Sequence, residues 1–208
     1  MSLIDAIRDL VRAAMRRVAR WLNTVTRGRL HPDTVTIVGF LMHIPIAILI
    51  ALQHYQVVAA MLLIIFGLFD TLDGELARLQ VKASARGMLL DASTDRMKEV
   101  LLYTGITYAL VLGKHPAMAV WATAACGVSL CVSYVKAKGE AAVAAGKPIP
   151  HATLNKLFKD GLLTFELRMA VLVIGLIANQ LVVAVAGIAL LGGFTALQRL
   201  GRISRALG

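Results

Sequence analysis

Hydrophobic residues occupy the chain in long blocks, and short polar segments separate one block from the next. A helix needs about 20 mainly apolar residues to cross the hydrocarbon core of a bilayer. Six blocks approach or exceed this length, and they cover residues 34–53, 57–79, 87–112, 116–138, 162–178 and 181–199. The pattern therefore predicts an all-α integral membrane protein with six transmembrane helices.

The first segment, residues 3–22, follows a different pattern, in which apolar residues recur at helical spacing between arginines. Ile7 and Leu10 belong to the apolar series, and Arg8 and Arg12 belong to the basic one. A helix with one apolar face and one basic face is typical of segments that lie in a membrane surface. Packing of this helix against a partner protein is the alternative.

The composition excludes a soluble enzyme and a disordered chain. Of the 208 residues, 58% are hydrophobic and 16% are charged, whereas an ordinary globular domain has about 45–50% apolar and about 25% charged residues. A soluble protein of this size would expose much of that apolar excess to water. We expect a single domain over residues 1–208, with an interfacial helix and its link at 1–30 and the six-helix bundle at 34–199.

The formal net charge is +10, and the positions of the basic residues predict the orientation of the chain. Basic residues precede the first predicted span and occur in the links 80–86 and 139–161 and near the C-terminus. The remaining links, at 53–56, 113–115 and 179–180, contain one lysine. The positive-inside rule and the anionic lipid headgroups both account for this asymmetry. We therefore expect a multi-pass protein of the cell membrane with both termini cytoplasmic, and no nucleic-acid partner.

Acidic residues are concentrated at the facing ends of the second and third predicted spans. Five of the 12 acidic residues are Asp70, Asp73, Glu75, Asp91 and Asp95. The first two aspartates are three residues apart and the last two are four apart, so each pair lies on one helical face. A turn joins the two helices and allows the pairs to face each other. Because an ionised carboxylate at membrane depth is costly, such residues indicate a functional site.

Four aspartates in one site would repel each other unless cations neutralised them. A set of oxygen ligands without cysteine or histidine favours Mg²⁺ or Mn²⁺ over zinc, and four carboxylates suffice for two ions, as in two-metal phosphoryl transfer. Gly74 leaves room for a phosphate, and Arg78 is suited to bind one. The alternative is that the acids form salt bridges at the interface with Lys82, Arg86, Arg96 and Lys98.

The complete stretch reads Asp70-x2-Asp73-Gly74-x2-Ala77-Arg78-x8-Gly87-x3-Asp91-x3-Asp95. It resembles the signature of the CDP-alcohol phosphotransferase family, and every fixed position is filled. The resemblance implies a six-span membrane enzyme with a juxtamembrane N-terminal helix, usually a homodimer. It also implies transfer of a phosphatidyl or archaetidyl group from a CDP-linked lipid, CDP-diacylglycerol or CDP-archaeol, to an alcohol, with release of CMP.

The resemblance also implies roles for individual residues. Asp70, Asp73 and Asp91 would bind two divalent cations, Mg²⁺ or Mn²⁺, and Asp95 would complete the metal cluster and act as the general base. The cations would stabilise the charge that develops on the departing CMP. The residues that would hold the CDP-lipid are Asp33, Thr36, Asp70, Gly74, Arg78 and Ser84.

Three basic residues in the later spans bear on the acceptor alcohol: Lys136, Arg168 and Arg199. If they converge beside the carboxylates, they form a pocket for a phosphate on a phosphorylated polyol; snorkelling toward the headgroups is the alternative. Their positions resemble the branch of the family that uses inositol 1-phosphate and makes phosphatidylinositol phosphate. That branch commonly has a richer arginine run where this chain has Phe165-Glu166-Leu167-Arg168. Glycerol 3-phosphate therefore remains the alternative acceptor.

Two other classes of membrane protein use similar residues. A membrane prenyltransferase also binds a diphosphate through aspartates and Mg²⁺, but it usually has more spans and lacks the spacing from Gly74 to Arg78. An ion transporter uses intramembrane acids as relays, but here the acids gather at one end instead of lining a path across the membrane.

Overall fold

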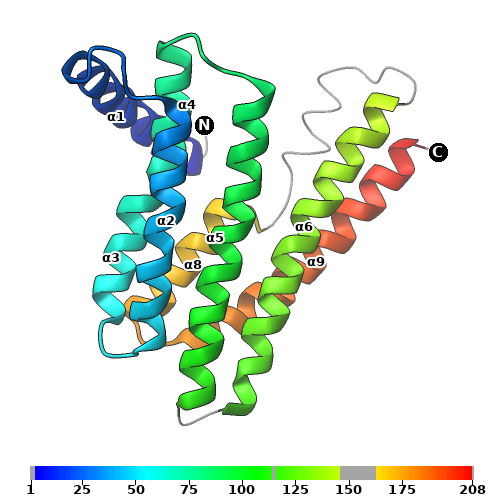
Figure 1. Ribbon diagram of the computed structural model, residues 1–208. Helices are drawn as coiled ribbons and strands as arrows, with labels where there is room; N and C mark the ends of the chain where they lie inside the picture. The colour runs from blue at the N-terminus through cyan, green and yellow to red at the C-terminus, as the bar shows by residue number, and fades with distance from the viewer. Residues whose placement is uncertain (1–2, 114–115, 146–162, 208) are drawn as a thin grey trace.

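The computed structural model describes residues 3–113, 116–145 and 163–207, and these residues form helices without any strand. The all-α class predicted from the sequence is therefore confirmed for this part of the chain (Figure 1). The elements are α1 (Leu3–Val25), α2 (Pro32–Ala51), α3 (Gln56–Gly67), α4 (Phe69–Leu79), α5 (Ala85–Leu112), the 3₁₀ turn η1 (Pro116–Met118), α6 (Ala119–Ala145), α8 (Phe165–Ile177) and α9 (Leu181–Leu207).

Four helical segments among the described residues are long and apolar enough to cross a membrane: Pro32–Ala51, Gln56–Leu79, Pro116–Val143 and Leu181–Arg205. The second combines α3 and α4, because Leu68 between them keeps helical dihedral angles, with φ −72° and ψ −16°. The predicted spans 87–112 and 162–178, which correspond to α5 and α8, are not among these four segments, and each has a physical reason. The first half of α5 carries many charged side chains, and α8 has 13 residues.

The helices extend beyond two of the predicted span ends. The apolar blocks end at residues 138 and 199, whereas α6 continues to Ala145 and α9 to Leu207. Charged residues end the apolar pattern, but the alanines and leucines that follow favour helix. Hydropathy therefore located the end of the apolar block and not the end of the helix. Most of the predicted 139–161 loop, with its three lysines, lies outside the described residues.

Small residues bring the helices of the bundle close together. A Cβ atom at Gly105 of α5 would lie 2.4 Å from the carbonyl oxygen of Ala47 in α2, and one at Gly192 of α9 would lie 2.6 Å from Val128 in α6. Glycine at these contacts allows the backbones to approach, as is common between membrane helices. The pair α6 and α9 runs side by side and tilts away from α2 and α5 (Figure 1).

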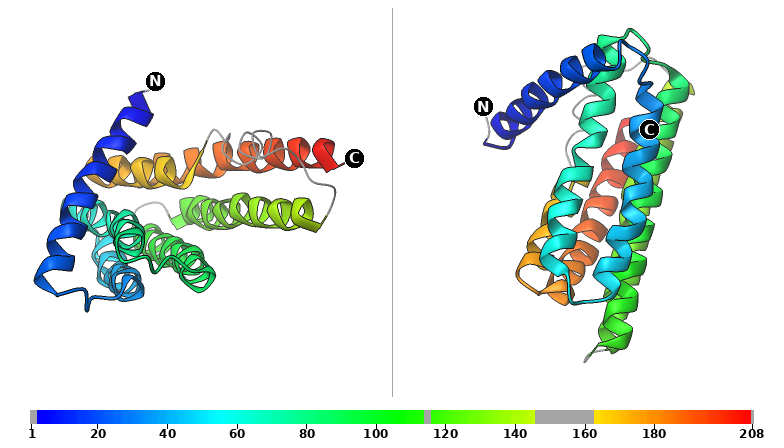
Figure 2. Two further views of the ribbon diagram at one scale, coloured as in Figure 1. Left: turned by 90° about the horizontal axis from the view of Figure 1, so that it is seen from above. Right: turned by 60° about the vertical axis from the view of Figure 1, so that its left-hand side comes forward.

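The main apolar core lies between the long helices. Its buried members include Ile46, Ile50, Leu63, Leu102, Ile106, Leu172, Leu176, Val185 and Ile188. A smaller cluster fixes α1 on the bundle, where Ala19 of α1 packs with Val35 of α2 and with Leu72 and Leu76 of α4. Figure 2 shows that α1 lies along one side of the upper part of the bundle, at a steep angle to the other helices.

One end of the bundle collects the segments that the charge pattern had grouped together. In Figure 1, α1, the link between α4 and α5, and the C-terminal ends of α6 and α9 all lie at the upper end. The links from α2 to α3 and from α8 to α9 lie at the opposite end. The acidic motif runs through α4 and into α5, so the fold places it near the end that holds the basic segments.

Candidate active site

The acidic residues are positioned by a short turn between α4 and α5. The hydroxyl of Ser84 caps α5 by accepting a hydrogen bond from the backbone N–H of Gly87 at 3.1 Å, which satisfies one of the free N–H groups at the helix start. The amide of Gln80 donates to Asn23 Oδ1 and to the carbonyl of Leu30, each at 2.9 Å. These bonds tie the turn to the last turns of α1 and to the link between α1 and α2.

Three of the predicted metal ligands lie together. Carboxylate oxygens of Asp70, Asp91 and Asp95 come within 4.8 Å of one another. One carboxylate oxygen of Asp91, Oδ1, is buried without a hydrogen-bond partner. Because a buried oxygen without a partner is costly, and because an all-carboxylate set suits hard divalent cations, these residues fit the metal site that the sequence predicts.

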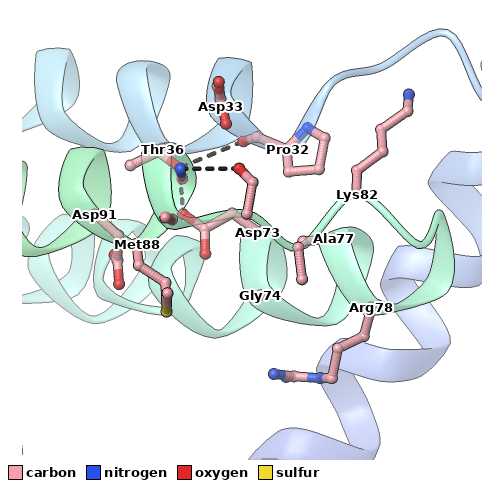
Figure 3. A pocket seen from close by; sticks show the side chains of 14 residues that line it. Pro32, Asp33, Thr36, Asp73, Gly74, Ala77, Arg78, Lys82, Met88 and Asp91 are labelled. Carbon is pink, nitrogen blue, oxygen red and sulfur yellow. Dashed lines mark hydrogen bonds between the residues drawn. The ribbon is translucent and has the colours of Figure 1, made fainter.

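The fourth predicted ligand, Asp73, has a different partner and is not part of that group of three. Its Oδ2 accepts a hydrogen bond from the hydroxyl of Thr36 at 2.5 Å, and the same hydroxyl lies 3.3 Å from the carbonyl of Pro32 (Figure 3). Asp73 is 6% exposed and lies along the pocket described below. The bond joins the start of α2 to α4, and a metal-binding role for Asp73 stays a prediction.

Lys98 lies among the clustered carboxylates. Its ammonium donates to Oδ1 of Asp70 and, at 3.2 Å, to Oδ1 of Asp95, and the residue is 1% exposed. From the sequence, Lys98 was expected only as one of several interfacial ion-pair partners of the acids. Its spacing predicts a position near Asp95, because a residue three positions later lies on the same helical face.

A pocket of about 430 Å³ adjoins these acids, between the start of α2, α4 and the start of α5 (Figure 3). It brings together five of the six residues predicted to hold the CDP-lipid, which are Asp33, Thr36, Gly74, Arg78 and Ser84. Asp73 and Asp91 also line it. Asp70, the sixth predicted contact, lies in the acidic cluster and does not line the pocket.

Arg78 lies at the edge of the pocket with a partner from its own helix. Its Nη2 donates to Oε1 of Glu75 at 2.8 Å, and Nε of Arg16 in α1 donates to the other oxygen of Glu75 at 3.2 Å. A Cβ atom at Gly74 would lie 3.5 Å from Arg78 Nη2, so the guanidinium passes close to the glycine backbone. Glu75 is 5% exposed, so α1 and Arg78 share one buried carboxylate.

The three predicted acceptor-binding residues have different surroundings, and none of them lines the pocket beside the acids. Lys136 is half exposed and lies 3.8 Å from Glu140. Arg168 is 1% exposed and donates to Glu99 at 2.8 Å. Arg199 is buried, and its Nε has no hydrogen-bond partner.

A buried ionic network surrounds Glu99, and it was not predicted from the sequence. The Glu99 carboxylate is fully buried and contacts Arg96 at 2.7 Å and Arg168 at 2.8 Å. The Phe165 ring lies 5.1 Å and 5.9 Å from the two guanidinium carbons, and Arg96 also donates to Ser133. The network thus joins α5, α6 and α8. The sequence feature that could have indicated Glu99 is its position four residues after Asp95, on the same face of the helix.

The chain belongs to the CDP-alcohol phosphatidyltransferase family, whose model matches residues 29–192. This match includes the whole acidic motif and most of the chain. It confirms the resemblance drawn from the motif, and it removes the prenyltransferase and the ion transporter as alternatives.

Similar proteins within the family are phosphatidylinositol phosphate synthases. The chain is 34% identical over 137 residues to that of Mycobacterium marinum, covering 64% of this chain and 57% of the relative, and 37% identical over 112 residues to that of Corynebacterium glutamicum, covering 53% and 51%. The matched stretches therefore span about half the length of these relatives.

The fold also matches that of a solved relative. The crystal structure of Mycobacterium tuberculosis phosphatidylinositol phosphate synthase with CDP-DAG bound has a TM-score of 0.76 and 24% identity, over 91% of this chain and 92% of that one. A second structure of the same protein, in complex with manganese and citrate, also has a TM-score of 0.76. At this identity, the likeness establishes the fold.

Proposed function

We propose that this protein is a phospholipid-biosynthetic transferase that moves the phosphatidyl group of CDP-diacylglycerol to inositol 1-phosphate, giving phosphatidylinositol phosphate and CMP. The observation that carries the proposal is the cluster of Asp70, Asp91 and Asp95 beside a pocket lined by the nucleotide-binding positions of the family motif. The similarity to phosphatidylinositol phosphate synthases of other organisms supports the same reaction.

The clustered carboxylates would hold divalent cations, Mg²⁺ or Mn²⁺, and Asp73 at the pocket edge would complete a site for two ions. When bound, the ions supply positive charge that stabilises the diphosphate and the departing CMP. The protein contributes a rigid ligand set, since α4 and α5 each bring carboxylates to one place. The manganese complex of the M. tuberculosis relative supports this assignment.

The nucleotide end of the lipid would occupy the pocket between α2, α4 and α5. Arg78 can offer charge-assisted hydrogen bonds to a phosphate, and the missing side chain at Gly74 keeps the approach open. Asp33, Thr36 and Ser84 would provide polar contacts from the helix starts that frame the pocket. The CDP-DAG complex of the M. tuberculosis relative is consistent with this placement.

Asp95 would take the proton from the attacking hydroxyl of the acceptor. Its carboxylate is held in place by Lys98 at 3.2 Å and Arg96 at 3.6 Å. Arg168 and Arg199 are the arginines proposed to bind the acceptor phosphate, and the unpartnered Nε of Arg199 is a donor that such a phosphate can use. Lys136 would join them from α6. Glycerol 3-phosphate, which is also anionic, is the second candidate acceptor.

The proposal also includes an arrangement in the membrane. We propose six spans, with α5 crossing as a helix of 28 residues whose charged side chains, such as Lys98 and Glu99, turn inward. The 13 residues of α8 are about 20 Å long, so α8 by itself is shorter than the hydrocarbon core of about 30 Å. α1 would lie in the membrane surface, with both termini and the site on the cytoplasmic side. The chain would act as one domain and as a homodimer.

CMP release by the purified protein in detergent tests the proposal. With CDP-diacylglycerol and Mg²⁺, we expect turnover with inositol 1-phosphate, and none with the Asp95→Asn variant, which should still bind the lipid nucleotide. Lys138→Met, on the exposed surface of α6, is the matched control and should keep full activity. Turnover with glycerol 3-phosphate alone would show that this compound, and not inositol 1-phosphate, is the acceptor. No CMP with either acceptor, from CDP-diacylglycerol or from CDP-archaeol, would overturn the reaction.

A further inference from the structure

Lys98 occupies a position where it interacts with two of the proposed metal ligands at once. Its ammonium contacts carboxylate oxygens of Asp70 in α4 and Asp95 in α5. We propose that Lys98 is an internal counter-ion that competes with divalent cations for these two carboxylates and thereby limits cation loading of the protein without its lipid nucleotide. The inference rests on the proposed metal-dependent function and deepens it.

The geometry places the ammonium of Lys98 within the carboxylate cluster. Lys98 is three residues after Asp95 and seven after Asp91, so all three lie on one face of α5. The side chain is 2% exposed, which leaves the ammonium little access to water. Its hydrogen bonds to carboxylates from two helices hold it between α4 and α5. A flexible surface lysine would not satisfy these conditions.

The charges explain why Lys98 would compete with a cation. Three ionised carboxylates and the Lys98 ammonium leave a net charge of two negative, which a single divalent cation balances. Arg96 also lies 3.6 Å from Asp95, but its charge is matched by Glu99 at 2.7 Å. A second divalent cation at Asp70 and Asp95 would lie close to the ammonium, and like charges repel strongly in a site that excludes water. Asp73 adds a further negative charge from its place beside Thr36. Loading of a second ion therefore requires displacement of Lys98 or added negative charge.

A lipid diphosphate supplies that negative charge. The nucleotide end of the lipid would enter the pocket lined by Asp73 and Asp91, next to the carboxylates that Lys98 holds. Its phosphates then offer the ammonium another partner and the cations more ligands. Lys98 is therefore a positioning residue that makes full cation loading depend on the substrate. When no substrate is bound, its ammonium reduces the repulsion between the carboxylates.

Binding of Mn²⁺, followed by electron paramagnetic resonance in detergent at fixed pH and without lipid nucleotide, tests the inference directly. We expect Lys98→Met and Lys98→Gln to bind Mn²⁺ about tenfold more tightly than the wild type, because no charge-assisted hydrogen bonds must be displaced. Lys138→Met removes the same charge from the exposed part of α6 and should leave the affinity unchanged. Asp91→Asn should weaken binding in every background.

Thermal unfolding gives a second readout that does not depend on activity. In EDTA, Lys98→Met should melt below the wild type, because the carboxylates then lack the ammonium; saturating Mn²⁺ should remove most of this difference, since a bound ligand stabilises the folded state. Unchanged or weaker Mn²⁺ binding in both Lys98 variants would overturn the inference and leave the metal site standing. No Mn²⁺ binding to wild type or variants would instead overturn the proposed function.

Discussion

The hydroxyl of Thr36 donates a hydrogen bond of 2.5 Å to the carboxylate of Asp73, and both residues are buried. The pair is 37 residues apart in the chain and connects the first turns of α2 with the acidic face of α4. The bond satisfies one oxygen of a carboxylate that would otherwise be costly to bury.

We expect Thr36→Val to lower the free energy of unfolding by about 1–3 kcal/mol, the cost of leaving a buried acceptor without its donor. Valine keeps the shape and removes the hydroxyl. Chemical unfolding in detergent with EDTA measures the effect without a bound cation. Thr36→Ser retains the hydroxyl and serves as the control, so equal losses in the two variants would contradict this explanation.

Glu99 should contribute more than an ordinary ion pair, because its fully buried carboxylate faces two guanidinium groups. Removal of one partner from a buried pair costs about 3–5 kcal/mol, so Glu99→Gln should destabilise the protein by a similar amount. The double variant Glu99→Gln, Arg168→Met should recover part of this loss in a double-mutant cycle. Glu140→Gln breaks an exposed pair and should change stability by less than about 1 kcal/mol.

The contact between α2 and α5 predicts a size limit at Gly105. A Cβ atom there would lie 2.4 Å from the backbone oxygen of Ala47, and backbone cannot move aside as a side chain can. Gly105→Ala should cost about 1–3 kcal/mol through overpacking and reduce CMP release, because α2 and α5 carry Thr36 and Asp95. Gly187→Ala in α9 meets no atom within 4 Å and should be neutral or stabilising. Equal effects in the two variants would refute the packing argument.

Val81, the second residue after α4, has a φ of +55°. This left-handed region is unfavourable for a β-branched residue by about 1–2 kcal/mol, and asparagine tolerates it much better. Val81→Asn should therefore raise the melting temperature in detergent and stabilise the protein by about 1 kcal/mol. Val81→Ile keeps the branched Cβ and should give no gain; a gain in both variants would point to a cause other than backbone strain.

Local spacing made the acidic motif predictable. Asp70, Asp91 and Asp95 lie within two helices joined by one turn, so helical periodicity alone brings them near each other. The same periodicity placed Gly74 and Arg78 after the first aspartates on α4. The other residues predicted to hold the CDP-lipid came from the family resemblance and not from helical spacing. The class of fold was equally accessible, because the apolar blocks define long helices without any knowledge of their packing.

Long-range packing decided what the sequence could not show. A lysine near the end of a span is expected to extend toward the headgroups, and this expectation does not describe Lys98. Lys98 is buried because carboxylates from two different helices meet around it. Likewise, the partner of Arg168 is Glu99, 69 residues earlier in the chain, and no spacing rule connects residues so far apart.

The hydrogen bonds of the Glu75 carboxylate predict how deletion of α1 would affect the pocket. It accepts hydrogen bonds from Arg16 in α1 and from Arg78 at the pocket edge, so the two guanidinium groups share one buried anion. Deletion of α1 would leave Glu75 to Arg78 alone, strengthening their pairing and reducing the donors that Arg78 can offer to a phosphate. Helix α1 therefore belongs to the electrostatic environment of the pocket, although none of its residues whose side chains the structure describes lines the cavity.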